Sequence, residues 1–173
     1  VRFTKRRVLG STSGAAALRV EAPTFKPSPQ DVSFRLIYGG SIETCREDLS
    51  GYNAVRLRAR SGARETTCME LDLIQRNGSV RGALVPLTAD WQTIEIPLMD
   101  FQPTVATWLP RSYPTIGFDY WDQGQKTDSR PLDLKDLEAV QISMGARFFP
   151  EFTDTRHAVE IEEIQLAKKS DVR

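Results

Sequence analysis

The sequence has few of the residues on which metal sites and covalent catalysis depend, since its 173 residues include two cysteines and one histidine. Cys45 lies in a polar stretch and Cys68 begins an alternating apolar run, and their spacing is not typical of metal ligands. A disulfide between them stays open, and two cysteines do not determine the redox compartment. We expect no required cofactor.

The chain also lacks an excess of charge and a long hydrophobic run. Its 23 Lys and Arg balance 23 Asp and Glu, so no net field attracts nucleic acid or an anionic membrane, and neutral partners are favoured. Without an apolar run of membrane-spanning length, we expect no membrane insertion. We interpret the chain as a module of a larger polypeptide and expect it to be secreted, periplasmic or at the cell surface.

Catalytic signatures are absent as well. There is no GxSxG elbow, glycine-rich phosphate loop or His/Cys cluster. A Ser/His or Cys/His device would need His157, which we interpret as an edge residue of the last predicted strand. Paired acids occur, but no flanking motif fixes a glycosidase geometry. We predict a noncatalytic domain, with a β-sandwich lyase or hydrolase as the enzymatic alternative.

What the sequence does contain is alternation of apolar and polar residues with a period of two, separated by turn residues. This pattern predicts an all-β, antiparallel two-sheet β-sandwich that forms a single domain over residues 1–173. The predicted strands are 17–21, 32–38, 54–60, 68–75, 80–86, 92–98, 139–144 and 158–166. The Asn77-Gly78 pair predicts a hairpin between the fourth and fifth of these strands.

Charged residues occupy one face of the two central predicted strands. Arg56 and Arg58 alternate with apolar residues, as do Glu70 and Asp72. If these two strands are antiparallel neighbours, the arginines and carboxylates pair across an outer face. That outer face is one candidate binding surface, although ion pairing would satisfy its charges without a ligand. We assign to it Arg56, Arg58, Glu70, Asp72, Glu95, Gln141 and Ser143.

The segment 99–136 differs from the rest because it is long, rich in proline and aromatic residues, and without regular period. Loops of this length in a compact domain are usually functional or disordered, and the aromatic residues argue against disorder. Aromatic rings stack on sugars, and carboxylates or amides bind sugar hydroxyls. The opposing interpretation is that the rings pack beneath their own loop. The candidate ligand-binding residues are Trp108, Tyr113, Asp119, Tyr120, Trp121, Asp122 and Gln123.

Five pieces of sequence carry a resemblance: SGAAALRVEA, DLSGYNAVRLRARS, WQTIEIPLMDF, LDLKDLEAVQISM and HAVEIEEIQL. Together they resemble the jelly-roll carbohydrate-binding modules of the galactose-binding-like superfamily, which are appended to glycoside hydrolases. The same order of pieces is similar to a domain of a respiratory complex I assembly factor. The resemblance therefore identifies an architecture more specifically than a ligand.

The resemblance implies a noncatalytic module that targets an attached polysaccharide-degrading enzyme to an oligo- or polysaccharide. It also implies a structural calcium ion, for which Glu21 and Glu162 are the nearest positional matches. Two alternatives stay open. The domain packs on a glycoside hydrolase catalytic domain of the same polypeptide, or it is a protein-assembly domain like the complex I factor.

Overall fold

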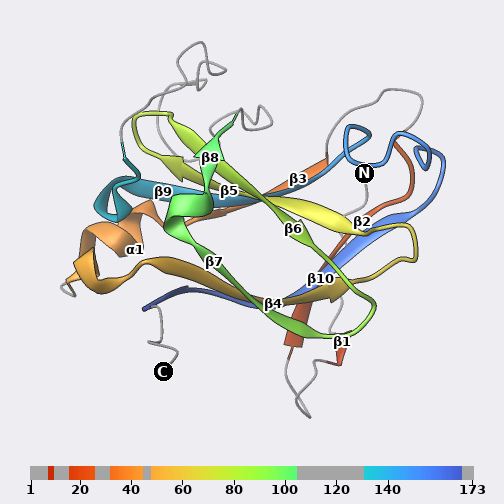
Figure 1. Cartoon of the computed structure of the whole chain (residues 1–173), viewed down its shortest axis with the longest axis horizontal. Helices are drawn as coiled ribbons and strands as arrows, with labels where there is room; N and C mark the ends of the chain where they lie inside the picture. Colours follow the sequence, from red (N-terminus) through yellow and green to blue (C-terminus); the bar gives the residue numbers. More distant parts are fainter. Residues whose placement is uncertain (1–7, 10–15, 26–31, 45–47, 105–130, 169–173) are drawn as a thin grey trace.

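The computed structural model describes residues 8–9, 16–25, 32–44, 48–104 and 131–168. Within these residues the chain forms two antiparallel sheets that face each other across a hydrophobic core (Figure 1). One sheet has the strand order β1-β2-β10-β4-β7 and the other β3-β9-β5-β6-β8. The predicted fold class, an all-β antiparallel sandwich, is confirmed.

The strands of the first sheet are β1 (Val8–Leu9), β2 (Ala16–Ala22), β10 (His157–Ala167), β4 (Ala54–Ser61) and β7 (Gln92–Pro97). Those of the second are β3 (Val32–Ile37), β9 (Leu137–Met144), β5 (Cys68–Gln75), β6 (Val80–Pro86) and β8 (Gln102–Pro103). The helical elements are α1 (Gly39–Thr44), η1 (Leu49–Gly51), η2 (Leu98–Asp100) and η3 (Leu134–Asp136). No described helix is long and apolar enough to cross a membrane.

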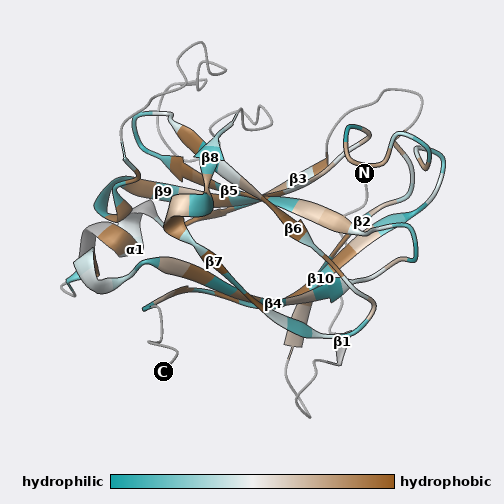
Figure 2. Cartoon of the chain, in the orientation of Figure 1, coloured by the Kyte–Doolittle hydropathy of each residue, from teal (hydrophilic) through white to brown (hydrophobic). Residues whose placement is uncertain are grey.

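Alternation along the strands builds the core. On β4 Leu57 is fully buried between half-buried arginines, and hydrophobic and hydrophilic residues alternate along this strand in Figure 2. On β5 Met69 and Leu71 are likewise fully buried and belong to the same hydrophobic core as Leu57. Successive side chains of a strand point to opposite faces, so a period of two places one row of each strand in the core.

All eight predicted strands are present, but one predicted pairing is wrong. β4 and β5 are not neighbours, because they lie in different sheets. β4 pairs with β10 and β7, whereas β5 pairs with β9 and β6. The chain between β4 and β5 therefore crosses from one sheet to the other, and the arginines of β4 cannot pair with the carboxylates of β5.

Turn chemistry explains two connections. Between β5 and β6 the chain reverses at Gly78, whose φ of 85° is readily adopted only by glycine, and the Gln75 N–H donates to the Ser79 carbonyl at 2.9 Å. The predicted hairpin is confirmed. Before β9, the side chain of Asp133 caps η3 by accepting the Lys135 N–H at 2.9 Å.

Candidate functional site

Six polar residues line the face of the second sheet that points away from the core, and we call this set the polar face. The register places them in two rows across β3, β9 and β5, because residues paired across antiparallel strands share a face. The rows are Ser33, Ser143 and Glu70, and Arg35, Gln141 and Asp72. Four of the six were predicted on an outer face, whereas Ser33 and Arg35 were not.

Hydrogen bonds fix the second row in one orientation. Arg35 donates from Nε and Nη2 to the Gln141 Oε1 atom at 3.1 and 2.7 Å. Because a guanidinium only donates, it fixes the amide oxygen of Gln141 toward β3 and leaves the amide N–H groups for β5. The Gln141 Nε2 atom accordingly donates to Asp72 Oδ2 at 3.2 Å and to Ser143 Oγ at 3.2 Å.

Asp72 is the least satisfied member of the polar face. Its side chain is fully buried. Among the buried side-chain nitrogen and oxygen atoms of the described residues, its Oδ1 atom is the one without a hydrogen-bond partner. Burial, followed by the nearby charge of Glu70, raises the pKa of Asp72 to about 7. A buried oxygen without a donor costs free energy, so this atom is the strongest sign of a ligand-binding function on this face.

Gly82 of β6 lies opposite Asp72 and makes room for the carboxyl groups. A Cβ atom at Gly82 would lie 2.6 Å from Asp72 Oδ1, 2.7 Å from the Thr104 methyl group and 3.2 Å from Glu70 Oε1. The two carboxyl groups therefore share the space above this glycine. The φ angle of Gly82 lies outside the left-handed region, so the close approach of neighbours explains the glycine.

Replacing Gly82 by alanine is expected to lower the free energy of unfolding by about 1–3 kcal/mol, because overpacking displaces the buried Asp72 carboxyl group. Chemical denaturation measures the difference. Gly40→Ala is the matched control, since a Cβ atom there meets nothing within 4 Å and the change should stay within about 0.5 kcal/mol. Equal stability of both variants would contradict the crowding above Gly82.

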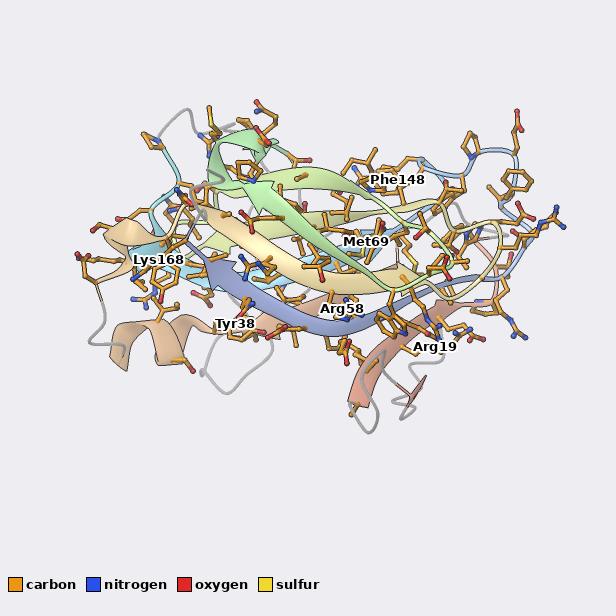
Figure 3. All side chains as sticks on the ribbon, turned by 60° about the horizontal axis from the view of Figure 1, so that its bottom comes forward. Arg19, Tyr38, Arg58, Met69, Phe148 and Lys168 are labelled. Atoms are coloured by element: carbon orange, nitrogen blue, oxygen red, sulfur yellow. The ribbon has the colours of Figure 1, made fainter. Side chains whose placement is uncertain are left out.

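Glu70 is held by groups at the end of the polar face. Arg147, in the segment after β9, forms an ion pair with Glu70 Oε2, and its guanidinium lies 4.4 Å from the centre of the Phe148 ring. Thr104 donates to Glu70 Oε1 at 3.4 Å. Phe148, labelled in Figure 3, is half-buried, and Arg147 contacts both its ring and the Glu70 carboxylate.

The outer face of the first sheet has a different character, because its charges pair with one another. Ion pairs join Arg56 to Glu95 at 2.9 Å and Arg58 to Glu162 at 2.8 Å. The predicted single outer face is therefore wrong: Arg56, Arg58 and Glu95 lie on one sheet, and the polar face lies on the other. The expected ion pairing occurs here, but between partners other than those predicted.

A second ion-pair network surrounds Glu160 at the centre of the first sheet. Glu160 is buried and lies between Arg19 of β2, which binds its Oε1 atom, and Arg60 of β4, whose Nε lies 2.6 Å from its Oε2 atom. Burial opposes the charge of Arg19, but hydrogen bonds to Glu160 and Glu21 hold the pKa of Arg19 above its ordinary value. Arg19 and Arg58 are labelled in Figure 3.

The two residues expected to hold calcium, Glu21 and Glu162, form ion pairs with arginines in the described structure. Glu21 contacts Arg19 at 3.0 Å and Arg156 at 3.4 Å, and Glu162 contacts Arg58. Calcium takes six to eight oxygen ligands, whereas the described residues contain no group of three or more His, Cys, Asp or Glu side chains that could hold a metal ion. Calcium binding at Glu21 and Glu162 stays an untested prediction.

His157 is not an edge residue, contrary to the sequence-based interpretation. It is fully buried on β10, which lies between β2 and β4, and its ring stacks against Phe149 at 4.3 Å and against Phe25 at 4.8 Å. Its Nε2 atom lies 2.8 Å from the Phe152 carbonyl and its Nδ1 atom 3.3 Å from the Thr66 hydroxyl. These contacts assign the ring a packing role.

The predicted aromatic site lies outside the described residues. This applies to Trp108, Tyr113, Asp119, Tyr120, Trp121, Asp122 and Gln123, which fall in 105–130. Cys45 is also outside, while Cys68 is a free, half-buried thiol. Thr104, the last described residue before 105–130, contacts Glu70 of the polar face.

A cavity of about 450 Å³ that the sequence did not predict lies beside η3 and the β5–β6 turn. Its lining residues are Gln75, Asn77, Pro131, Asp133, Lys135 and Asp136. Gln75 is buried and donates from Nε2 to the Asp133 carbonyl at 3.3 Å, and Asp133 is the cap of η3. These contacts serve the turn itself.

No protein-family profile and no curated protein matches the chain. Several solved structures resemble it at low identity. A protein named PfGH50B superposes with a TM-score of 0.53 and 18% identity, over 91% of this chain and 21% of its own. An exo-β-agarase gives 0.53 and 15%, over 95% and 22%. A family 11 carbohydrate-binding module from Clostridium thermocellum, in complex with a β-1,3-1,4-mixed-linked tetrasaccharide, gives 0.48 and 14%, over 90% and 84%.

The chain thus spans about a fifth of the length of the exo-β-agarase and of PfGH50B. Identities of this size identify a fold and leave ligands and activities open. The strand order and the superpositions agree on the architecture expected from the sequence. The chain has an antiparallel two-sheet β-sandwich fold, which also occurs as part of an exo-β-agarase.

Proposed function

We propose that this domain is a noncatalytic carbohydrate-binding module that holds an uncharged glycan against the polar face. The observation that carries the proposal is the buried Asp72 Oδ1 atom, an acceptor without a donor inside an otherwise hydrogen-bonded network. Sugar hydroxyl groups donate to carboxylates, and a donor at Oδ1 would offset part of the cost of burying the carboxyl group.

The composition of the polar face suits a sugar. Carboxylate, amide and guanidinium groups each offer two atoms side by side, which matches neighbouring hydroxyl groups on a pyranose ring. Apolar side chains on the same face supply contact for the C–H side of the ring. Ile37 on β3 is 63% exposed and Leu84 on β6, paired with Glu70, is 60% exposed. The rings at 108–121 remain predicted stacking platforms.

Attachment to a polysaccharide-degrading enzyme is part of the proposal. The likeness to about one fifth of an exo-β-agarase chain supports this part, because it is the relationship that a module has to a larger enzyme. Galactan and mixed-linkage β-glucan are accordingly the first glycans to test. The proposal includes a secreted or cell-surface location, since polymeric glycans of this kind lie outside the cell.

Retention on agarose beads and retardation in gels that contain agarose or β-1,3-1,4-glucan test the proposal. A few solvent-exposed hydrogen bonds and one or two stacked rings give about 4–7 kcal/mol, so we expect affinities between millimolar and micromolar. The eluted oligosaccharide should be unchanged in length, since the domain is proposed to be noncatalytic. Absence of glycan retention would favour an accessory domain that only packs against a catalytic domain.

Asp72→Asn is expected to weaken glycan binding at pH 8 by at least about tenfold, because a hydrogen bond to a charged acceptor becomes one to a neutral amide. Glu95→Gln, which changes the same kind of group on the opposite sheet, should bind as the wild type does. Trp108→Ala and Trp121→Ala should abolish retention while the melting temperature stays near that of the wild type. If melting falls and binding persists, those rings serve packing.

A further inference from the structure

Two carboxyl groups of the polar face lie over the same glycine in a buried place. Asp72 Oδ1 and Glu70 Oε1 both lie over Gly82, at 2.6 and 3.2 Å from the position of a Cβ atom there. Asp72 is fully buried and Glu70 nearly so, with 9% of its surface exposed. Two carboxylates in such proximity do not both ionise readily in a region of low dielectric constant, and a shared proton relieves their repulsion.

Charged and polar groups from several elements surround this pair. From β3 and β9, Arg35 contacts Gln141, and the Gln141 amide and Ser143 hydroxyl reach the Oδ2 atom of Asp72. Arg147, after β9, binds the Oε2 atom of Glu70. Gly82 on β6 brings no charge, and Thr104 reaches Glu70 Oε1 at 3.4 Å. Of the two oxygen atoms above Gly82, Asp72 Oδ1 is the one without a hydrogen-bond donor among the described residues.

We propose that glycan binding on the polar face is coupled to the release of a proton from the Asp72–Glu70 pair. The inference rests on the proposed function and adds its regulation. The Asp72 Oδ1 atom can hold a proton that it shares with Glu70 Oε1, or it can accept a hydrogen bond from a sugar hydroxyl. The proton and the sugar hydroxyl therefore compete for the same atom. The glycan must carry a free hydroxyl group where it meets Asp72 Oδ1, since a methylated or acetylated oxygen cannot donate a hydrogen bond.

The sign of the effect follows from linkage. A hydroxyl that donates to the ionised form of Asp72 lowers the pKa of this group in the complex, so binding releases a proton and affinity rises with pH. With the pKa of unliganded Asp72 at about 7, the ionised fraction falls about tenfold between pH 8 and pH 6. We therefore expect the affinity to fall about tenfold over the same interval.

Isothermal titration calorimetry with soluble agarose oligosaccharides at pH 6, 7 and 8 tests this coupling. The wild type is expected to lose about tenfold in affinity from pH 8 to pH 6. Glu70→Gln removes the negative charge beside Asp72, so its ratio of affinities at the two pH values should shrink toward one. Glu95→Gln, on the opposite sheet, should keep the wild-type ratio.

Each outcome decides between the proposals. Equal affinity at pH 6 and pH 8, or an undiminished ratio in Glu70→Gln, overturns the coupling but leaves glycan binding standing. Absence of binding at every pH overturns the proposed function and the coupling with it. Circular dichroism at pH 6 establishes that each variant is folded, so that a loss of affinity reports on the site.

Discussion

Replacing Glu160 by alanine is expected to lower the free energy of unfolding by about 3–5 kcal/mol, the cost of removing one partner of a buried ion pair. The Glu160 side chain is 4% exposed and bridges Arg19 and Arg60 across the centre of the first sheet. Arg19, whose side chain is 15% exposed, would keep Glu21 and the Gly62 carbonyl but lose its most buried partner. Chemical denaturation at neutral pH measures the loss.

Glu95→Ala is the matched control for this prediction. The Arg56–Glu95 pair lies on the same face, but its side chains are 35% and 31% exposed, and exposed ion pairs contribute less than about 1 kcal/mol. The destabilisation should therefore differ several-fold between two replacements of the same kind. Equal losses would show that burial does not set the value of the Glu160 network.

Asp72→Asn is expected to stabilise the protein at alkaline pH, which is unusual for a change at a fully buried residue. The folded-state pKa of Asp72, about 7, lies above its ordinary value of 3.8. The contribution of such a group to stability is fully present below the unfolded pKa and is lost as pH rises through the folded pKa. By pH 8 the wild type loses on the order of 4 kcal/mol from this group, and asparagine avoids this loss.

Denaturation of both proteins at pH 5 and pH 8 checks this prediction. The stability difference between Asp72→Asn and the wild type should grow from pH 5 to pH 8, because only the wild type must ionise a buried carboxyl group. The amide that this substitution introduces could also donate toward Glu70 Oε1, which lies over the same glycine. Asp90→Asn, which makes the same change at an exposed position, is the control. A constant difference for Asp72→Asn would contradict a raised pKa.

The same substitution is thus expected to increase stability and to weaken glycan binding. This combination would distinguish a binding residue from a packing residue, because a residue that serves packing alone has no reason to cost the fold free energy. Asp72 is the described residue for which this argument is strongest, since its Oδ1 atom has no partner and its neighbours hold it in one place.

The strands could be predicted because their signal is local. Period-two alternation on β4 and β5 directly reports which residues enter the core, and Asn77-Gly78 reports a reversal. The neighbours of each strand could not be predicted in this way. β5 lies beside β9, which comes much later in the sequence, and nothing in the alternation of β4 distinguishes β5 from β10 as its partner.

For the candidate site, too, the faces of single strands could be predicted but the neighbouring strands could not. Alternation placed Asp72 and Gln141 on outer faces, but only the register shows that Arg35 completes their row. Arg35 stands between apolar residues on β3, which places it on an outer face, but the sequence does not show which strand lies beside β3. His157 was misinterpreted for a related reason: its stacking partner Phe25 lies far away in the sequence. Predictions for 105–130 remain untested.

The position of β9 and β10 in the two sheets has a consequence for biosynthesis. β10 separates β2 from β4, and β9 separates β3 from β5, so each sheet has its last strand in sequence inserted between earlier ones. A nascent chain that has not yet reached β9 exposes unpaired edges on four strands, and such edges template aggregation. Neither sheet can close during translation until the C-terminal strands emerge, so we expect truncated chains to aggregate and the complete domain to fold slowly after synthesis.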